Sequence, residues 1–228
     1  MSSLATLLAA GLKVQAQDIA QPEQKKLIQF VELLNKWNKV YNLTSIRQPE
    51  AMISLHLLDS LVMLPFFSGK ISDDNIIKRV LDVGTGGGIP GIPLAICCPD
   101  IDFVLMDARG KKIRFIQTAI AQLALKNVTA IHSRVEEFQV DEHEKFDRII
   151  SRAFASLNDM LMLCQHLCYK GDESRDNGQF LAMKGQIPEE EIAQLPEGFR
   201  IEQINELKVS GLNAQRHLIQ IAFAPLVS

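Results

Sequence analysis

The sequence lacks long apolar runs, excess positive charge and paired metal ligands, and each shortage excludes a class of protein. No stretch of about 18 apolar residues is present, so we expect no membrane span. The net charge of −3 means that any attraction to nucleic acid must come from a local basic patch. Among four cysteines, Cys164 and Cys168 lie one helical turn apart without two further ligands, so we expect buried thiols and no metal site.

Several motifs of enzyme chemistry are also missing. There is no Gly-Lys-Ser/Thr loop for ATP and no Gly-x-Ser-x-Gly for acyl transfer, and the five histidines show no metal-ligand spacing. The first 11 residues carry no basic residue before their short apolar run, unlike a signal peptide. Their leucines share one helical face, so we expect a mature amphipathic helix and a cytoplasmic protein.

What is present is a composition that can bury a core, with 47% hydrophobic and 22% charged residues. Residues 1–68 show helical periodicity and predict a helical N-terminal extension, including one helix from Pro49 to Pro65. The polar stretch 68–78 is typical of a linker between this extension and the next unit. Residues 79–228 alternate strand and helix patterns, which predicts an α/β domain with a mostly parallel sheet covered on both faces. Expected strands are 79–83, 103–106, 128–131, 146–151 and 180–183, followed by an antiparallel terminal hairpin of 201–209 and 217–223.

The stretch 79–93 is the main functional signal. A short apolar strand runs into a series of glycines and then into a helix start, which is how an open α/β sheet forms a ligand crevice. Gly86-x-Gly88-x-x-Gly91 fits dinucleotide spacing, whereas Asp82-x-Gly84-x-Gly86-x-Gly88 is the form associated with S-adenosylmethionine. The spacing alone does not choose between the two ligands.

Two further strand ends carry candidate cofactor residues. Asp107 follows Gly86 by 21 residues and is placed to accept hydrogen bonds from ribose hydroxyls, unless it is simply a solvated acid. In the stretch 133–137, Val135 is a candidate to cover an adenine ring and Glu136 to bond its exocyclic amine. An acidic helix start is the alternative there.

Basic residues suggest where RNA would lie. Arg152 closes the fourth strand and is a candidate contact for cofactor, phosphate or base, with a surface ion pair as the alternative. A second group of cations lies at the start of the helix after Asp107, where positive charge opposes the helix dipole; this indicates either phosphate contact or a solvated face. Its members are Arg109, Lys111, Lys112 and Arg114. Lys184, Arg216 and His217 are candidates to extend this positive rim.

Taken together, these motifs resemble the bacterial glucose-inhibited division protein B family, the small-subunit ribosomal RNA guanine-N7 methyltransferases. The glycine stretch Asp82–Pro93 resembles the family signature, and further blocks follow in family order: 37–44, 56–60, 133–138, 150–154 and 183–186. One departure is Ala108-Arg109, where relatives more often have a serine and an apolar residue.

The resemblance implies the class I methyltransferase fold, a Rossmann-like doubly wound sheet, and S-adenosylmethionine as cofactor. It implies methylation of N7 of one guanine, position 527 in the usual 16S numbering, in the 530 loop. By motif, Gly84, Ile89, Val135, Glu136 and Arg152 match the family's cofactor contacts, beside the Gly86, Gly88 and Asp107 expected above. Positions expected near the RNA or the crevice are Asn42, Arg134 and Arg216.

The chemistry agrees with the lack of an obvious catalyst. N7 has a lone pair and no proton, so we expect no catalytic residue and a mechanism of positioning alone. The expected partner is 16S RNA or a small-subunit particle, and the expected state is a monomer. Three rivals remain open at this point: a nicotinamide-dependent oxidoreductase, a small-molecule methyltransferase, and a non-catalytic RNA-binding protein.

Overall fold

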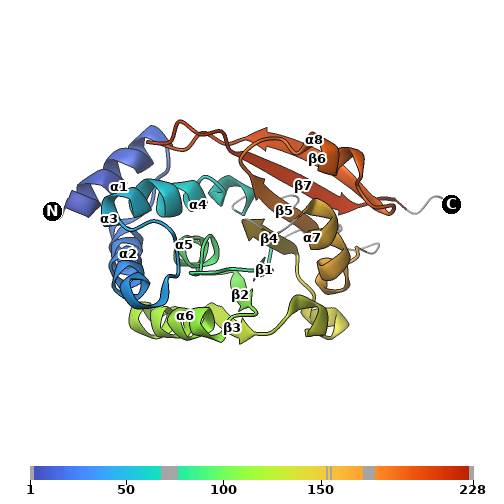
Figure 1. The fold of residues 1–228 in the computed structure, drawn as a ribbon, viewed down its shortest axis with the longest axis horizontal. Coiled ribbons are helices and arrows are strands. Elements are labelled where there is room, and N and C mark those ends of the chain that lie inside the picture. Colours follow the sequence, from blue (N-terminus) through green and yellow to red (C-terminus); the bar gives the residue numbers. More distant parts are fainter. Residues whose placement is uncertain (1–2, 68–76, 153, 155, 172–177, 226–228) are drawn as a thin grey trace.

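A computed structural model describes residues 3–67, 77–152, 154, 156–171 and 178–225 (Figure 1). The expected linker 68–78 therefore falls mostly outside the described residues.

The described part of the chain up to residue 67 is helical, as the periodicity predicted. Its elements are α1 (Ser3–Val14), α2 (Gln21–Tyr41), α3 (Pro49–Met52), η1 (Ile53–Leu58), α4 (Asp59–Leu61) and η2 (Leu64–Phe66). Pro22 lies in the first turn of α2, where its missing N–H costs nothing. The expectation of one regular helix from Pro49 to Pro65 is wrong. The segment η1 is a π-helix, in which the Asp59 N–H reaches back to the Ser54 carbonyl.

Seven strands form one sheet in the order β3-β2-β1-β4-β5-β7-β6. Their bounds are β1 (Arg79–Val83), β2 (Asp102–Asp107), β3 (Val128–His132), β4 (Arg148–Arg152), β5 (Gln179–Lys184), β6 (Phe199–Glu206) and β7 (His217–Phe223). The first five strands pair in parallel, and β7 pairs antiparallel with both β5 and β6. The predicted mostly parallel sheet and terminal hairpin are confirmed. The fourth strand starts at Arg148 rather than 146, since Phe146 makes only an isolated bridge with Cys168.

Both faces of the sheet are covered, because successive strand residues point to opposite sides. In β2, Phe103 and Leu105 pack into one apolar cluster and Val104 and Met106 into the other. The first cluster also holds the N-terminal helices with α5 (Gly91–Cys97) and α6 (Gly110–Leu123), so the extension shares a core with the sheet. The second is closed by α7 (Leu157–Cys164), η5 (Gln165–Leu167) and side chains next to α8 (Glu189–Ala193). None of the helices in the described part of the chain combines the length and apolar character needed to cross a bilayer.

The strand order places a switch point between β1 and β4. From β1 the chain moves outward to β2 and β3, then returns to the other side of β1 to form β4. The connections that follow β1 and β4 run in opposite directions, and this opens a crevice between them at the carboxyl ends of the strands. The glycine loop after β1 and Arg152 at the end of β4 both lie at this edge.

Candidate functional site

The glycine loop after β1 depends on backbone angles that other residues rarely adopt. Gly84, Gly86 and Gly88 have φ angles of 68°, 62° and 77°. The Gly88 and Ile89 N–H groups both donate to the Thr85 carbonyl, at 3.0 and 3.1 Å, and close the turn. The three positive angles explain why this stretch is rich in glycine.

Asp82 fixes this loop from below. Its side chain is fully buried, and its Oδ2 accepts from the Thr85 hydroxyl at 2.6 Å and from the Gly91 N–H at 2.9 Å. Burial raises the pKa of Asp82 to about 7, although the Thr85 and Gly91 hydrogen bonds act in the opposite direction. Asp82 therefore joins the strand, the loop and the start of α5.

A first cavity of about 410 Å³ opens beside this loop, within the range of small-molecule sites. Its lining comes from the ends of β1 and β2, the start of α6, the segment after β3, and α7. The residues are Val83, Gly84, Met106, Asp107, Ala108, Arg109, Lys112, Ser133, Arg134, Val135, Glu136, Phe154 and Leu163.

Asp107 is held at the base of the cavity by contacts within the chain. Its Oδ2 accepts from the Gly86 N–H at 3.0 Å and from Lys112 Nζ at 3.3 Å, and its Oδ1 accepts from the Arg109 N–H at 2.9 Å. A carboxylate offers about four acceptor positions, so Oδ1 keeps one for a ligand hydroxyl. The acid can therefore bind a ribose without losing its own supports.

The opposite wall is the short helix η3 (Val135–Glu137) after β3. Val135 is buried and presents an apolar surface, while Glu136 and Arg134 are exposed and lie 3.9 Å apart. At that separation and exposure the pair contributes little stability, so both groups are available to a ligand.

The cavity wall has the features that a nucleoside needs. Gly84 is exposed in the wall, and a Cβ there would lie 3.6 Å from Phe154 Cδ2 and would narrow the gap between them. Together with the acid Asp107 and the apolar Val135, this fits the adenosine and amino-acid parts of S-adenosylmethionine.

The other predicted loop residues lie behind this wall. Gly86 is half-buried and supports Asp107, whereas Gly88 and Ile89 are buried in the core. A Cβ on Gly88 would lie 2.6 Å from Ile92 Cδ1, so the Ile92 side chain would have to move to admit it. Of the loop residues expected to contact cofactor, only Gly84 lines the cavity.

A second cavity of about 470 Å³ lies further along the same edge, and the structure places Arg152 there and not in the first. Its lining is Thr44, Ser45, Ile46, Leu55, His56, Asp59, Arg152, Met183, Lys184, Gly185 and Arg216. A narrow third cavity shares Phe154 with the first and Met183 and Lys184 with the second. The two large cavities are therefore neighbours.

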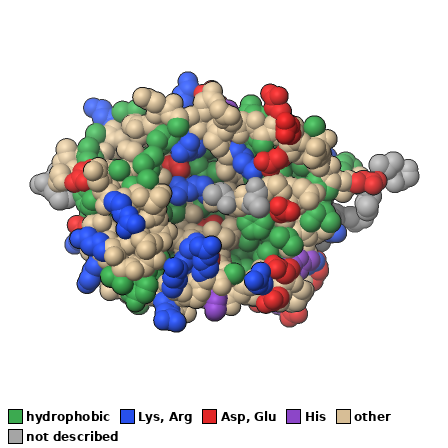
Figure 2. Space-filling model, in the orientation of Figure 1, with side chains coloured by type: hydrophobic (Ala, Val, Ile, Leu, Met, Phe, Trp, Pro, Cys, Tyr) green, Lys and Arg blue, Asp and Glu red, His purple; other side chains and the backbone are tan. Residues whose placement is uncertain are grey.

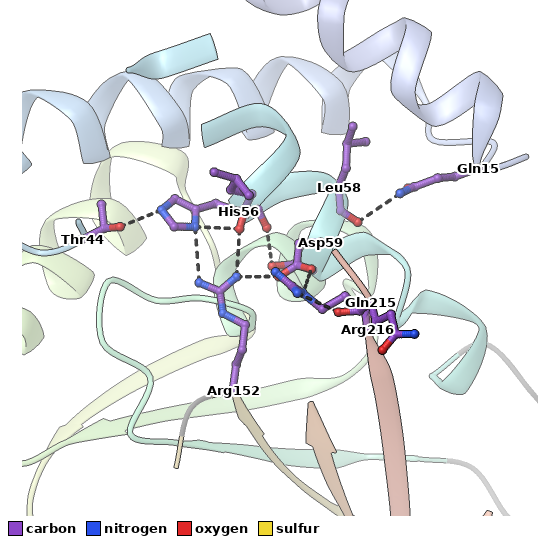
Figure 3. Close-up of polar contacts among 10 residues, drawn as sticks. Gln15, Thr44, His56, Leu58, Asp59, Arg152, Gln215 and Arg216 are labelled. Atoms are coloured by element: carbon purple, nitrogen blue, oxygen red, sulfur yellow. Dashed lines mark hydrogen bonds and ion pairs between the residues drawn. The ribbon is translucent and has the colours of Figure 1, made fainter. Parts of the chain in front are cut away.

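At the wall of the second cavity, Asp59 binds two arginines (Figure 3). Arg152 Nη1 lies 2.8 Å from Asp59 Oδ2, and Arg216 Nε lies 2.7 Å from Asp59 Oδ1. Arg152 Nη1 also donates to the Leu55 carbonyl at 3.0 Å. These contacts join α4 to the end of β4 and to the residue before β7.

His56 completes the cluster as a neutral ring. Nδ1 lies 2.9 Å from the Leu55 carbonyl and 3.3 Å from Arg152 Nη2. Because the carbonyl oxygen can only accept, we place the ring proton on Nδ1, from which it is donated to Leu55. Nε2 then accepts from the Thr44 hydroxyl at 2.9 Å. Burial and then the charge of Arg152 lower the pKa of His56 to about 4.

The predicted RNA-contact residues divide into two groups that line the cavities and three residues that line neither. Arg109 and Arg134 lie at the first cavity with Lys112, and Lys184 and Arg216 lie at the second with Arg152. Lys111 and Arg114 are exposed on α6 outside both cavities. Asn42 caps α2 with a φ of 50° and accepts from Arg47 Nη2 at 2.8 Å, lining neither cavity. In Figure 2, Lys and Arg side chains gather over the left and central parts of the face shown.

Sequence reasoning assigned no role to Asp59, His56 or Thr44, although all three lie in the blocks 37–44 and 56–60 that resemble the family. A signal was present: Asp59 is a charged residue within the apolar stretch Leu57, Leu58, Leu61. An acid at a core position needs a buried partner. Its partners, 93 and 157 residues away, become apparent only once the sheet order is known.

Comparisons with known proteins agree with this geometry. Residues 23–219 match the model of the family described as rRNA small subunit methyltransferase G (GidB). The protein named ribosomal RNA small subunit methyltransferase G from Shewanella amazonensis is 48% identical over 218 residues, which cover 96% of each chain. The protein of the same name from Aeromonas salmonicida is 50% identical over 202 residues, 89% of each chain.

Solved structures support the fold. A SAM-dependent methyltransferase from Aquifex aeolicus aligns with a TM-score of 0.54 at 17% identity, over 83% of this chain and 98% of that one. A SAM-dependent O-methyltransferase from Thermotoga maritima aligns with a TM-score of 0.51 at 15% identity, over 84% of this chain and 71% of that one. The predicted class I methyltransferase fold is confirmed. With the family match over most of its length and the high identity to these relatives, the chain belongs to the rRNA small subunit methyltransferase G family.

Proposed function

We propose that this protein transfers a methyl group from S-adenosylmethionine to N7 of one guanine in the 530 loop of 16S ribosomal RNA. The observation that carries the proposal is the pair of neighbouring cavities at one sheet edge, one suited to a nucleoside and one lined with cations. Its full-length relatives carry the name ribosomal RNA small subunit methyltransferase G. We propose the cytoplasm as its location and the monomer as its active form, because one chain supplies both cavities.

In this proposal the first cavity holds the cofactor, which supplies a methyl group on a positively charged sulfur when bound. Asp107 Oδ1 accepts a ribose hydroxyl, and Val135 covers the adenine ring beside Glu136. Gly84 allows close approach of the amino-acid part. The chain thereby fixes the cofactor from both ends.

No residue of the chain has to remove a proton, because guanine N7 carries a lone pair and no hydrogen. His56 is not available for that task, since both of its ring nitrogens have partners and its pKa is lowered to about 4 by burial and by Arg152. The contribution of the chain is to align the two reactants, which can supply about 7–11 kcal/mol of barrier lowering.

The acceptor guanine must reach the crevice edge unpaired. In an A-form helix N7 lies in a deep, narrow major groove that side chains do not enter. We therefore propose that the protein acts on RNA, free or in an assembling particle, whose target base is exposed or extruded.

The test is methyl transfer from labelled S-adenosylmethionine to three substrates: naked 16S RNA, reconstituted small-subunit particles, and particles already methylated at the target. We expect one methyl per unmethylated substrate, mapped to N7 by borohydride and aniline cleavage, and none on the premethylated particle. Tight NADH binding without S-adenosylmethionine binding would support an oxidoreductase instead. Cofactor binding without methylation of either unmethylated substrate would contradict the proposed substrate.

A further inference from the structure

Asp59 is a buried acid that two arginines from distant parts of the chain share. Only 1% of its side chain is exposed, and each of its oxygens accepts from a different guanidinium group. Arg152 comes from the end of β4, and Arg216 comes from the residue before β7. The cluster therefore fixes two cations side by side at the wall of the second cavity (Figure 3).

The charges of this cluster do not cancel. One carboxylate balances one of the two arginines, and His56 is held neutral by burial, which lowers its pKa to about 4. The neighbouring Lys184 is balanced by Glu191, whose Oε2 lies 3.0 Å from Lys184 Nζ. With Lys184 balanced by Glu191, the side chains that line the second cavity thus keep one positive charge in excess, which matches the charge of one phosphodiester.

Both guanidinium groups also keep donors that none of the described residues accepts. Arg152 Nη1 has two partners, Asp59 and Leu55, but its Nε has none within the described part of the chain. For Arg216, Nε and Nη1 have partners, whereas Nη2 has none among the described residues. Both side chains line the second cavity and are 24% and 23% exposed. Arginine forks of this kind suit phosphate oxygens.

The chemistry of methyl transfer favours a phosphate over the guanine ring as the ligand of these arginines. As N7 bonds to the methyl group, positive charge moves from sulfur onto the guanine. Two cations against that ring would oppose the charge movement, whereas a phosphate beside the acceptor would screen them. The cations therefore belong to the backbone next to the base.

We propose that Arg152 and Arg216 together bind one phosphate of the RNA backbone next to the methyl acceptor. In this proposal, which rests on the proposed function, Asp59 is the positioning residue that holds both side chains for that contact. Each arginine would otherwise lose rotamer freedom on binding RNA. Asp59 removes that cost in advance, because it orders both side chains before the RNA arrives.

The first test is the salt dependence of RNA binding, measured with unmethylated small-subunit particles. Neutralising one phosphate contributes a slope of about 0.7–0.9 in the plot of log affinity against log salt. We expect Arg152→Gln and Arg216→Gln each to reduce the slope, and the double variant to reduce it by no more than about this one unit, because both share one phosphate. Arg200→Gln, on β6 at the far end of β7, is the control and should keep the wild-type slope.

The second test separates positioning from simple charge. Asp59→Asn removes a negative charge, so bulk electrostatics predicts tighter RNA binding, whereas loss of positioning predicts weaker binding. We expect the KM for particles to rise about tenfold, with the dissociation constant for S-adenosylmethionine and kcat each within about threefold of wild type. Unchanged cofactor affinity also shows that the variant is folded. If Asp59→Asn does not fold, the two arginine variants decide the question.

The outcomes distinguish this proposal from the proposed function. A wild-type protein that methylates RNA, with salt slopes unchanged in both arginine variants, would overturn the phosphate site and leave the function standing. If the losses of slope in the two single variants add up to about two units in the double variant, the two arginines do not share one phosphate, and the proposal is overturned. A wild-type protein that binds cofactor and methylates no RNA would overturn both.

Discussion

Asp82 and Gly91 are joined by a hydrogen bond of 2.9 Å between the carboxylate Oδ2 and the backbone N–H at the start of α5. The contact is so close that a Cβ on Gly91 would lie 2.7 Å from the same oxygen and 2.9 Å from Leu105 Cγ. Both atoms are fixed, one by its hydrogen bonds and the other by the core. The glycine is therefore needed for space rather than for a left-handed backbone.

Gly91→Ala should push α5 away from the sheet and loosen the loop that Asp82 holds. We expect a loss of about 1–3 kcal/mol of unfolding free energy, the usual cost of overpacking a core. Urea denaturation measures it, and Gly185→Ala is the matched control. A Cβ on Gly185 would have only the Gln215 carbonyl, at 3.9 Å, within reach. Equal stability of the two variants would contradict the close approach at Gly91.

Gly86→Val should abolish binding of S-adenosylmethionine while most of the fold survives. The φ of 62° costs a non-glycine residue about 1–2 kcal/mol, and the shifted backbone would withdraw its N–H from Asp107. Gly198→Val is the control, since its φ of 87° is equally unfavourable and no atom lies within 4 Å of its Cβ position. Calorimetric titration should show lost affinity in the first variant only. Unchanged affinity in Gly86→Val would remove the loop from the site.

Asp107→Asn tests the ribose contact. A hydrogen bond to a charged group is worth about 1.5–3 kcal/mol, so we expect affinity for S-adenosylmethionine to fall about tenfold to a hundredfold. An S-adenosylmethionine analogue without the ribose hydroxyls supplies the control on the ligand side. The variant and wild-type protein should bind this analogue equally weakly. An equal loss for both ligands would mean that Asp107 acts only through the loop.

The pH dependence of stability should depend on two buried groups with opposite effects. His56 has its pKa lowered from 6.5 to about 4, so the unfolded chain takes up its proton first as the pH falls, and stability is lost between those values. Asp82 has its pKa raised from 3.8 to about 7, so stability is lost as the pH rises through that range. From about pH 4.5 to 6 the two effects offset each other, because each changes stability by about 1 kcal/mol per pH unit.

Asp82→Asn removes one of these effects and leaves the other. Relative to wild type, its unfolding free energy should rise with pH by about 1 kcal/mol per unit between about pH 4.5 and 6. His56→Asn should change the slope in the opposite direction. Urea unfolding at several pH values measures both slopes. Identical slopes in all three proteins would show that neither group titrates as its burial implies.

Much of the fold could be predicted from the sequence because buried strands leave local signals. The span 79–83 was predicted to the residue, since an apolar run ends there at a glycine. A strand was expected at 201–209, whereas β6 covers Phe199–Glu206. The bounds differ because a half-exposed edge strand carries polar residues, and these resemble the residues of the adjoining loops. The π-helix was missed, since its extra residue per turn leaves no mark in an apolar stretch.

The candidate site divides in the same way. Asp107 is the last residue of β2 and Val135 lies three residues after β3, so their place at the carboxyl edge follows from the order of the elements. Arg152 is likewise the last residue of β4, yet it lies in the second cavity because its partner Asp59 belongs to the helical extension. The pairing of Asp59 with Arg152 depends on how the helical extension packs against the sheet, and neither segment alone has a sequence pattern that predicts it.

The reversed direction of β7 has one further consequence. Each parallel strand brings its end to the crevice, whereas β7, pairing Lys184 with His217, brings its beginning. Arg216, the last residue of the segment 207–216, thereby lies at the second cavity and not at the first. If the first cavity binds the cofactor and the second binds RNA, as we propose, changes at the end of that segment should alter which RNA is accepted and leave the methyl donor unchanged. Under this proposal, the choice of acceptor and the choice of donor can be engineered independently.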